Sequence, residues 1–209
     1  MSKFLRDYGK RSDFHRQSAA IYSGATKDHL DQYINDKDES IRWLAARHPN
    51  ASDENLKEAL GDHVYSVRMS AAENKRISPK LLMVASDDKD DRVRSSAALN
   101  PNASKEHINK ALDDEDYMVR TASAGNKSAT KEHLDKAMND KHQYVRRAAL
   151  QNPNSGPEHL DKAFKDEHWM MRATAAEHKN ATHEQLNKAL GDDVSSVHYA
   201  AKKNLESRK

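Results

Sequence analysis

Residues 105–120, KEHINKALDDEDYMVR, bring many chemically capable side chains together in a short stretch. Glu106 beside His107 could serve as a general acid and base, or supply ligands to a metal ion. Four acids at 113–116 and the guanidinium of Arg120 could hold a cation or an anion. Residues 152–172, NPNSGPEHLDKAFKDEHWMMR, follow the same pattern. Because a catalytic group is needed once per site, this recurrence directs attention to the elements that carry these side chains.

A repeat of 26 residues organises the chain. The motif HPN at 48–50 and the motifs NPN at 100–102 and 152–154 lie 52 residues apart, and NKR at 74–76 and NKS at 126–128 halve this spacing. Seven copies follow, beginning at Ala25, Ala51, Ile77, Ala103, Ala129, Ser155 and Ala181. A fixed period in this range is typical of solenoids and other repeat arrays.

Each copy is expected to form two short amphipathic helices. Positions 6, 9 and 10 of the copy are mostly aliphatic or small, as are positions 17 and 21, and both sets have helical spacing. Position 2 is Ser or Thr in most copies, which suits a helix N-cap. Position 24 is Asn or His, and an Asn there is expected to adopt the left-handed conformation that closes a helix. Stripes this narrow make a core only when copies stack.

The sequence therefore predicts an all-α fold, a right-handed α-solenoid of seven 26-residue two-helix repeats plus an N-terminal half-repeat cap. Residues 1–24 are expected to form this partial cap, because DFHRQSAAIYSG matches the phase of a second helix. The expected repeats span 25–50, 51–76, 77–102, 103–128, 129–154, 155–180 and 181–206, and residues 207–209 are expected to form a polar tail.

Two motifs resemble known repeat families. The second-helix motif, an Asp, five residues and then an Arg followed by Ala, as in DKDESIRWLAA and DEHWMMRATAA, resembles HEAT-type repeats. The junction N-P-N-x-S/T-x-E-x-L resembles the leucine-rich repeat variant family, and the two resemblances cover about residues 13–206. They imply an α-solenoid, a fold that hosts many unrelated roles. One branch of the variant family is associated with an iron–sulfur cluster, but this chain has no cysteine, so no cofactor is expected.

The Asp and Arg of the second-helix motif recur in nearly every copy, which favours a structural ladder over catalysis. Each Asp is expected to accept hydrogen bonds from backbone N–H groups at a helix start and from Arg forks, and so to fix the superhelical twist. The last copy has His198 in place of Arg. The expected ladder comprises Asp36, Arg42, Asp62, Arg68, Asp88, Arg94, Asp114, Arg120, Asp140, Arg146, Asp166, Arg172 and Asp192.

The Glu-His pairs at 106–107, 132–133 and 158–159 are expected to lie on a solvated helix face. Histidines one helix layer apart are separated by about 8–10 Å, too far to share a zinc ion, so no metal is expected. The acids instead suit i,i+4 pairs with lysine, at Glu106–Lys110, Glu132–Lys136, Glu158–Lys162 and Glu184–Lys188. No nucleophile, base and orienting acid come together, so no enzyme is expected; the exception would be a HEAT-like DNA glycosylase.

Composition narrows the classes of partner. Hydrophobic residues make up 36% and charged residues 33% of the chain, and the mean hydropathy of −1.05 allows only a thin core. The net charge of +2 gives no strong basic field of the kind that announces a nucleic-acid binder. No segment has the length and apolarity of a membrane span or a signal peptide, so a cytoplasmic protein without membrane contact is expected.

Binding is expected at positions that vary between copies, which are positions 15 and 19. In HEAT-like solenoids the second helix lines the concave surface, so the resemblance implies a groove carrying Trp43, Tyr65, Tyr117, Arg147, Trp169 and Tyr199. The alternative is that these side chains pack between layers and cover the core. In the third copy, Leu81, Met83 and Val84 replace a polar face, through either a partner contact or drift of the repeat.

The sequence favours a non-enzymatic scaffold or adaptor that binds a protein or peptide along the concave face. A nucleic-acid-binding protein is the first alternative, with arginines on phosphates and aromatic rings stacked on bases. The near-neutral charge and the Asp partners of the ladder disfavour it. The second alternative is a structural subunit of a larger cellular or viral assembly.

Overall fold

A computed structural model describes residues 24–208 of the chain, and this part is entirely helical, with fourteen α-helices and no strand. The half-repeat cap expected at residues 1–24 lies outside the described residues, apart from Gly24. The helices are α3 (Lys27–Tyr33), α4 (Glu39–Arg47), α5 (Asp53–Leu60), α6 (Tyr65–Glu73), α7 (Pro79–Ala85), α8 (Asp91–Leu99), α9 (Lys105–Leu112), α10 (Tyr117–Gly125), α11 (Lys131–Ala137), α12 (Gln143–Gln151), α13 (Pro157–Ala163), α14 (Trp169–Glu177), α15 (His183–Ala189) and α16 (Ser195–Glu206).

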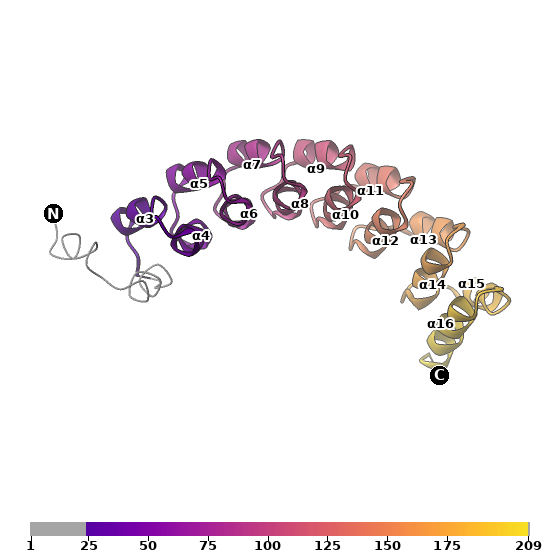
Figure 1. Ribbon diagram of the computed structural model, residues 1–209. Helices are drawn as coiled ribbons and strands as arrows, with labels where there is room; N and C mark the ends of the chain where they lie inside the picture. Colours follow the sequence, from indigo (N-terminus) through magenta and orange to yellow (C-terminus); the bar gives the residue numbers. More distant parts are fainter. Residues whose placement is uncertain (1–23, 209) are drawn as a thin grey trace. The chain divides into compact units, whose positions relative to one another are not determined.

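The helices alternate between a short first helix and a longer second helix. The described residues divide into two compact units, 24–107 and 108–208. Within each unit the odd-numbered helices form one row, called here the first-helix layer, and the even-numbered helices form the second-helix layer (Figure 1). The second-helix layer comprises α4, α6 and α8 in residues 24–107, and α10, α12, α14 and α16 in residues 108–208.

The prediction of an all-α solenoid of two-helix repeats is confirmed by this regular pairing. Its handedness and the exact division into repeats, cap and tail stay predictions. Within the described residues the longest helix, α16, has 12 residues, and no helix combines the length and apolar character required to cross a membrane.

The histidines near the start of the first helices are buried, so the prediction that they lie on a solvated face is wrong. His107, His133 and His159 are only 3%, 5% and 2% exposed. In each, the ring Nδ1 accepts a hydrogen bond from the backbone N–H of the N-cap residue, as at Gly156, where the distance is 2.9 Å. The imidazole thus takes the place of the Glu or Gln of a capping box. Asn55 and Gln185 perform the same role in their own repeats.

The asparagines that end the second helices are not left-handed, so that prediction is also wrong. Asn126 has φ −65° and ψ 130°, and no described residue has a positive φ. The side chain closes the helix instead. The carboxamide of Asn100 accepts the N–H of Asn102 and donates to the carbonyls of Ala72 and Asn74 in the preceding repeat, at 2.7 and 3.1 Å. Asn74, Asn152 and Asn204 donate in the same way.

The core is a row of aliphatic side chains between the two layers. In residues 24–107, Leu30, Leu56 and Leu82 from the first helices and Val67 and Val93 from the second helices are fully buried. Burial of each such side chain contributes roughly 1.5–3 kcal/mol. Buried alanines let neighbouring second helices approach closely, as at Ala71 and Ala72 in α6. The surfaces of the second helices are therefore held in fixed register from one repeat to the next.

Candidate interaction surface

Within each unit, the Arg–Asp ladder joins one repeat to the next. Nε and Nη2 of Arg120 donate to the two carboxylate oxygens of Asp140, at 2.6 and 3.1 Å. Nη1 donates to the backbone carbonyls of Asp114 and Glu115, both at 2.9 Å. The structure brings four further pairs together in this two-pronged way: Arg42–Asp62, Arg68–Asp88, Arg146–Asp166 and Arg172–Asp192. The Asp of a repeat therefore serves the Arg of the repeat before it.

Each ladder aspartate also holds the start of its own second helix. Asp140 Oδ1 accepts the N–H of His142 at 2.8 Å, and Asp36 and Asp114 accept the corresponding N–H groups. Burial acts to raise the pKa of Asp140, but the hydrogen bonds from Arg120 and from the His142 N–H outweigh it and hold the pKa below the ordinary value. The hydrogen bond from Arg172, only partly opposed by burial, lowers the pKa of Asp192 to about 2.

Two further positions of the ladder contact backbone carbonyls. Nη1 of Arg94 donates to the backbone carbonyl of Asp88 at 3.0 Å. His198, which stands where the other repeats have Arg, has its Nδ1 2.7 Å from the carbonyl of Leu190. The five paired arginines are hydrogen-bonded to carboxylates, and all but the half-buried Arg172 are buried, so their guanidinium groups are not available to a ligand.

In residues 108–208, aromatic side chains gather on neighbouring second helices. The ring of Tyr117 in α10 stacks on His142, with 3.9 Å between centroids, and lies 6.2 Å from the ring of Tyr144 in α12. Tyr144 is 45% exposed and was missed by the sequence reasoning, which compared positions 15 and 19. Position 16 carried the signal, since Met118, Tyr144 and Met170 are all large there.

These rings form one wall of a shallow cavity whose lining includes the positively charged side chain of Arg147. The cavity has a volume of about 370 Å³ and is lined by Tyr117, Met118, Thr121, Tyr144, Arg147, Ala148 and Gln151. Nε of Arg147 is buried and has no hydrogen-bond partner among the described residues. Nη1 of Arg147 lies 3.8 Å from the sulfur of Met170 in α14. No acidic side chain lines the cavity.

Two further predicted residues extend the same layer. Trp169 in α14 is 44% exposed, and its indole lies 5.9 Å from the ring of His168. Tyr199 in α16 is 66% exposed. The large hydrophobic side chains that are exposed in residues 108–208 all belong to second helices: Met118, Tyr144, Trp169 and Tyr199.

Two aromatic rings of the second helices in residues 24–107, those of Trp43 and Tyr65, lie against arginines of the chain itself. The guanidinium of Arg47 lies 5.1 Å from the ring centre of Trp43, which is half-buried. Arg92 lies 3.5 Å above the ring of Tyr65 and is held there by Asp90 at 2.7 Å. A shallow cavity beside Trp43 is lined by Glu39, Ser40, Trp43, Leu44 and Ser66.

The apolar helix of the third repeat, α7, is mostly part of the core. Leu81 is 8% exposed and packs in the core, Met83 is half-buried, and Val84 is 56% exposed. Leu81 occupies the position of the capping histidines, and Ser78 at the start of α7 makes no side-chain cap hydrogen bond. A partner contact at Leu81, Met83 and Val84 stays a prediction, in which Val84 offers the open surface.

The first-helix layer is covered by charges that pair between repeats. Lys131 reaches Glu158 of the next repeat at 2.7 Å, and Lys136 reaches Asp113 of the preceding one at 2.7 Å. Lys162 likewise donates to Asn139. The i,i+4 prediction holds at Glu184–Lys188, at 2.8 Å, but is wrong for Glu158–Lys162, because the repeat spacing gives both side chains partners in the preceding repeat. Among the described residues, no three potential metal ligands converge.

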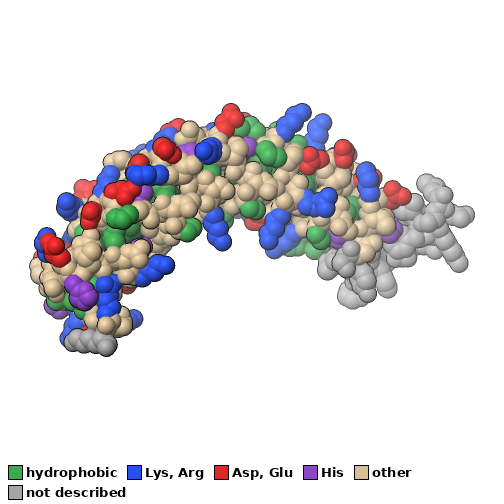
Figure 2. Space-filling model, turned by 180° about the vertical axis from the view of Figure 1, so that it is seen from behind, with side chains coloured by type: hydrophobic (Ala, Val, Ile, Leu, Met, Phe, Trp, Pro, Cys, Tyr) green, Lys and Arg blue, Asp and Glu red, His purple; other side chains and the backbone are tan. Residues whose placement is uncertain are grey.

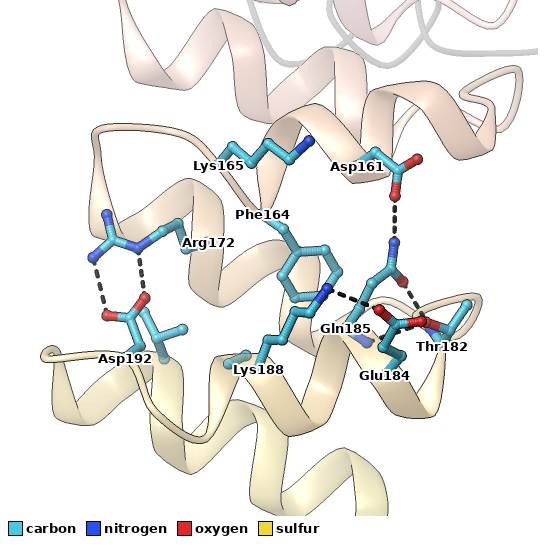
Figure 3. Close-up of a pocket in the computed structure, with 11 residues that line it drawn as sticks. Asp161, Phe164, Lys165, Arg172, Thr182, Glu184, Gln185, Lys188 and Asp192 are labelled. Atoms are coloured by element: carbon cyan, nitrogen blue, oxygen red, sulfur yellow. Dashed lines mark hydrogen bonds and ion pairs between the residues drawn. The ribbon is translucent and has the colours of Figure 1, made fainter.

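A second cavity, of about 490 Å³, lies between α13 and α15 (Figure 3). Phe164 and the stem of Lys188 lie at its centre, and charged side chains surround them. Most of these charges are occupied: Arg172 by Asp192, Glu184 by Lys188, and Asp161 by Gln185. This cavity therefore provides fewer unpaired charges for a ligand than the cavity beside Arg147.

Comparison with known proteins identifies the class of fold. The pairing of short helices defines a two-helix-repeat solenoid. A solved structure described as a leucine-rich repeat variant with a novel repetitive protein structural motif is similar, with a TM-score of 0.70 and 24% identity, and the match covers 96% of this chain and 79% of that one. The fold is thus of the leucine-rich repeat variant type, as that resemblance predicted; the HEAT resemblance stays a prediction. No protein-family model and no curated protein matches the chain.

Proposed function

We propose that this chain is a non-enzymatic interaction scaffold that binds a protein or peptide through the second-helix layer of residues 108–208. A single observation carries the proposal: the exposed large hydrophobic side chains of these residues all lie on that layer. Scattered exposed hydrophobic residues are ordinary on a protein surface, but aromatic rings gathered beside an arginine are typical anchors of an interface.

The proposal includes four of the six residues expected from the sequence to bind a partner. Tyr117, Arg147, Trp169 and Tyr199 belong to this layer, and Tyr144 joins them. Trp43 and Tyr65 lie in residues 24–107, where Arg47 and Arg92 cover their rings. The expected position on a concave face becomes, in this proposal, a position on the second-helix layer.

Nucleic acid is a weaker candidate partner. Binding to a phosphate backbone gains its free energy from several cations that replace condensed counterions. The arginines that recur along the second helices are already paired with aspartates in the neighbouring repeats. The recurring acids and arginines that could suggest catalysis are used in the same pairs, which supports a scaffold rather than an enzyme.

A peptide display experiment tests the proposal. The full chain is used to select binders from a random dodecapeptide phage library, and the dissociation constants of the selected peptides are measured on variants. The double variant Trp169→Ser, Tyr199→Ser is expected to weaken binding by about tenfold or more, because exposed aromatic anchors dominate such interfaces. The matched control is Leu99→Ser, which removes an exposed hydrophobic side chain from α8, outside residues 108–208. An empty selection, or equal affinity for all three proteins, would contradict the proposal.

A further inference from the structure

The cavity between α10 and α12 contains a positive charge that the chain leaves without a carboxylate. We infer that this cavity binds an acidic peptide segment. A carboxylate of the peptide pairs with Arg147, and a neighbouring aromatic or apolar side chain packs on Tyr117, Met118 and Tyr144. This inference rests on the proposed function and specifies the chemistry of its partner.

Arg147 differs from the arginines of the second helices that pair with a carboxylate. Arg146, one residue earlier, donates to both oxygens of Asp166 at 2.7 and 2.6 Å, and Arg92 is held by Asp90. By contrast, the buried Nε of Arg147 has no hydrogen-bond partner among the described residues, and its Nη1 meets only the weak acceptor of Met170. A buried donor without an acceptor costs free energy. A carboxylate entering the cavity supplies the planar, two-pronged acceptor that a guanidinium prefers.

The surrounding charge also favours an acidic partner. The helices α10 and α12 contain no acid, and the acids of α14 and α16 are their last residues, Glu177 and Glu206. The first-helix layer on the other side carries the acids Glu132, Asp135, Glu158, Asp161 and Glu184. Figure 2 shows acidic and basic side chains interleaved along the edge that the first helices form. Since lysines pair with the acids of the first-helix layer, the uncompensated charge of Arg147 makes the second-helix layer the better match for an acidic segment.

The size and walls of the cavity suit a side chain rather than a folded domain. Its volume of about 370 Å³ is near the lower end of the range for ligand sites, roughly 300–1,000 Å³. Tyr117 is held by its stacking on His142, so its ring is already fixed for an incoming aromatic group. Met118 and Tyr144, each 45% exposed, provide apolar surface that a partner can cover.

A peptide fits these observations better than a nucleic acid does. A single arginine without a carboxylate lies beside the rings, whereas a strand of nucleic acid requires a series of cations along its backbone. The adjacent arginines of the layer, Arg120, Arg146 and Arg172, are paired. A peptide with one carboxylate next to one aromatic side chain matches a cavity in which Arg147 lies beside Tyr117 and Tyr144.

A charge-reversal selection tests the inference on the full chain. Dodecapeptides selected from the random phage library on the wild type are expected to be enriched in Asp or Glu next to Trp, Phe or Tyr. The same selection on Arg147→Glu is expected to lose this acidic enrichment. Affinity of the best wild-type peptide is expected to fall by about tenfold or more on Arg147→Gln, and to weaken with added salt. Replacement of the acids of that peptide by their amides should have a similar effect.

One control variant and the double variant of the proposed function separate this inference from that function. Arg92→Gln removes an arginine of the other unit that Asp90 and Tyr65 already engage, so it should leave the affinity unchanged. Thermal melts of each variant check that the chain remains folded. If Trp169→Ser, Tyr199→Ser weakens peptide binding but Arg147→Gln does not, the scaffold stands and the acidic partner is wrong. Selection of basic peptides, or tight binding of a labelled oligothymidine that Arg147→Gln abolishes, would also overturn the acidic-peptide assignment.

Discussion

The second-helix layers of residues 24–107 and of residues 108–208 have the same internal connections but expose different side chains. Both contain paired ladder arginines, such as Arg68 with Asp88 and Arg146 with Asp166. In residues 24–107 the aromatic rings of Trp43 and Tyr65 are covered by arginines of the chain itself. In residues 108–208, Tyr144, Trp169 and Tyr199 are 45%, 44% and 66% exposed. Positions that hold the stack together are thus separate from positions that are free to acquire a partner.

The largest expected loss of stability comes from removing a ladder arginine, a feature that both units share. Arg68→Ala and Arg120→Ala should each lower the free energy of unfolding by about 3–5 kcal/mol, because each leaves a buried aspartate without its cation. Urea unfolding measures the loss, and hydrogen exchange shows in which unit protection disappears. Similar losses in the two units are expected. A loss below about 1 kcal/mol in either unit would mean that the ladder is not what holds its repeats.

The asparagine ladder should have the next largest effect. Asn152→Ala removes the donor that serves the buried carbonyls of Ala124 and Asn126, and should cost about 1–3 kcal/mol. Asn74→Ala is the matched change in the other unit, where the carbonyls belong to Ala46 and His48. Asn152→Asp keeps the shape but replaces the donor by an acceptor, so it should be at least as damaging at neutral pH. Retained stability in Asn152→Asp would contradict the role of the N–H donor.

The sequence predicted the repeat and its ladder residues, because a residue type that recurs every 26 positions leaves a visible pattern. Recurrence could not tell which way a side chain points. His107 follows Glu106 in a polar first turn and looks solvated, yet stacking of the repeats buries it beside the carbonyl of Pro79. The register of the pairs was also hidden, since the Asp six positions before each Arg offers its carbonyl, and the carboxylate comes from the next repeat.

The candidate site was harder to predict than the fold. Positions 15 and 19 pointed to Tyr117, Trp169 and Arg147, but the cavity depends on which side chains meet across repeats. Tyr144 lies at position 16 and completes the wall only because α10 and α12 pack together. That Arg147 has no carboxylate beside it, whereas Arg146 has one, follows from their directions on the helix.

Lowering the pH should remove the stabilisation that the Arg172–Asp192 pair of the ladder contributes. The hydrogen bond from Arg172 lowers the pKa of Asp192 from an ordinary 3.8 to about 2. The unfolded chain therefore binds this proton at a higher pH than the folded chain, so the stabilisation is present above about pH 4 and disappears as the pH falls through 2. The stability difference between wild type and Arg172→Gln, measured by urea unfolding, should shrink over this interval. A difference that stays constant from pH 5 to pH 2 would exclude the linkage.

The smallest expected effect on stability comes from the exposed aromatic side chains, in which the two units differ. Tyr144→Ser and Trp169→Ser alter side chains that are 45% and 44% exposed, so each should change the free energy of unfolding by at most about 0.5 kcal/mol. Tyr65→Ser in the other unit should cost slightly more, since it also releases the stacked guanidinium of Arg92. Parallel urea titrations of the three variants measure this. A loss above about 2 kcal/mol for Tyr144→Ser or Trp169→Ser would mean that these rings support the stack, and the open surface would then be a covering for the thin core.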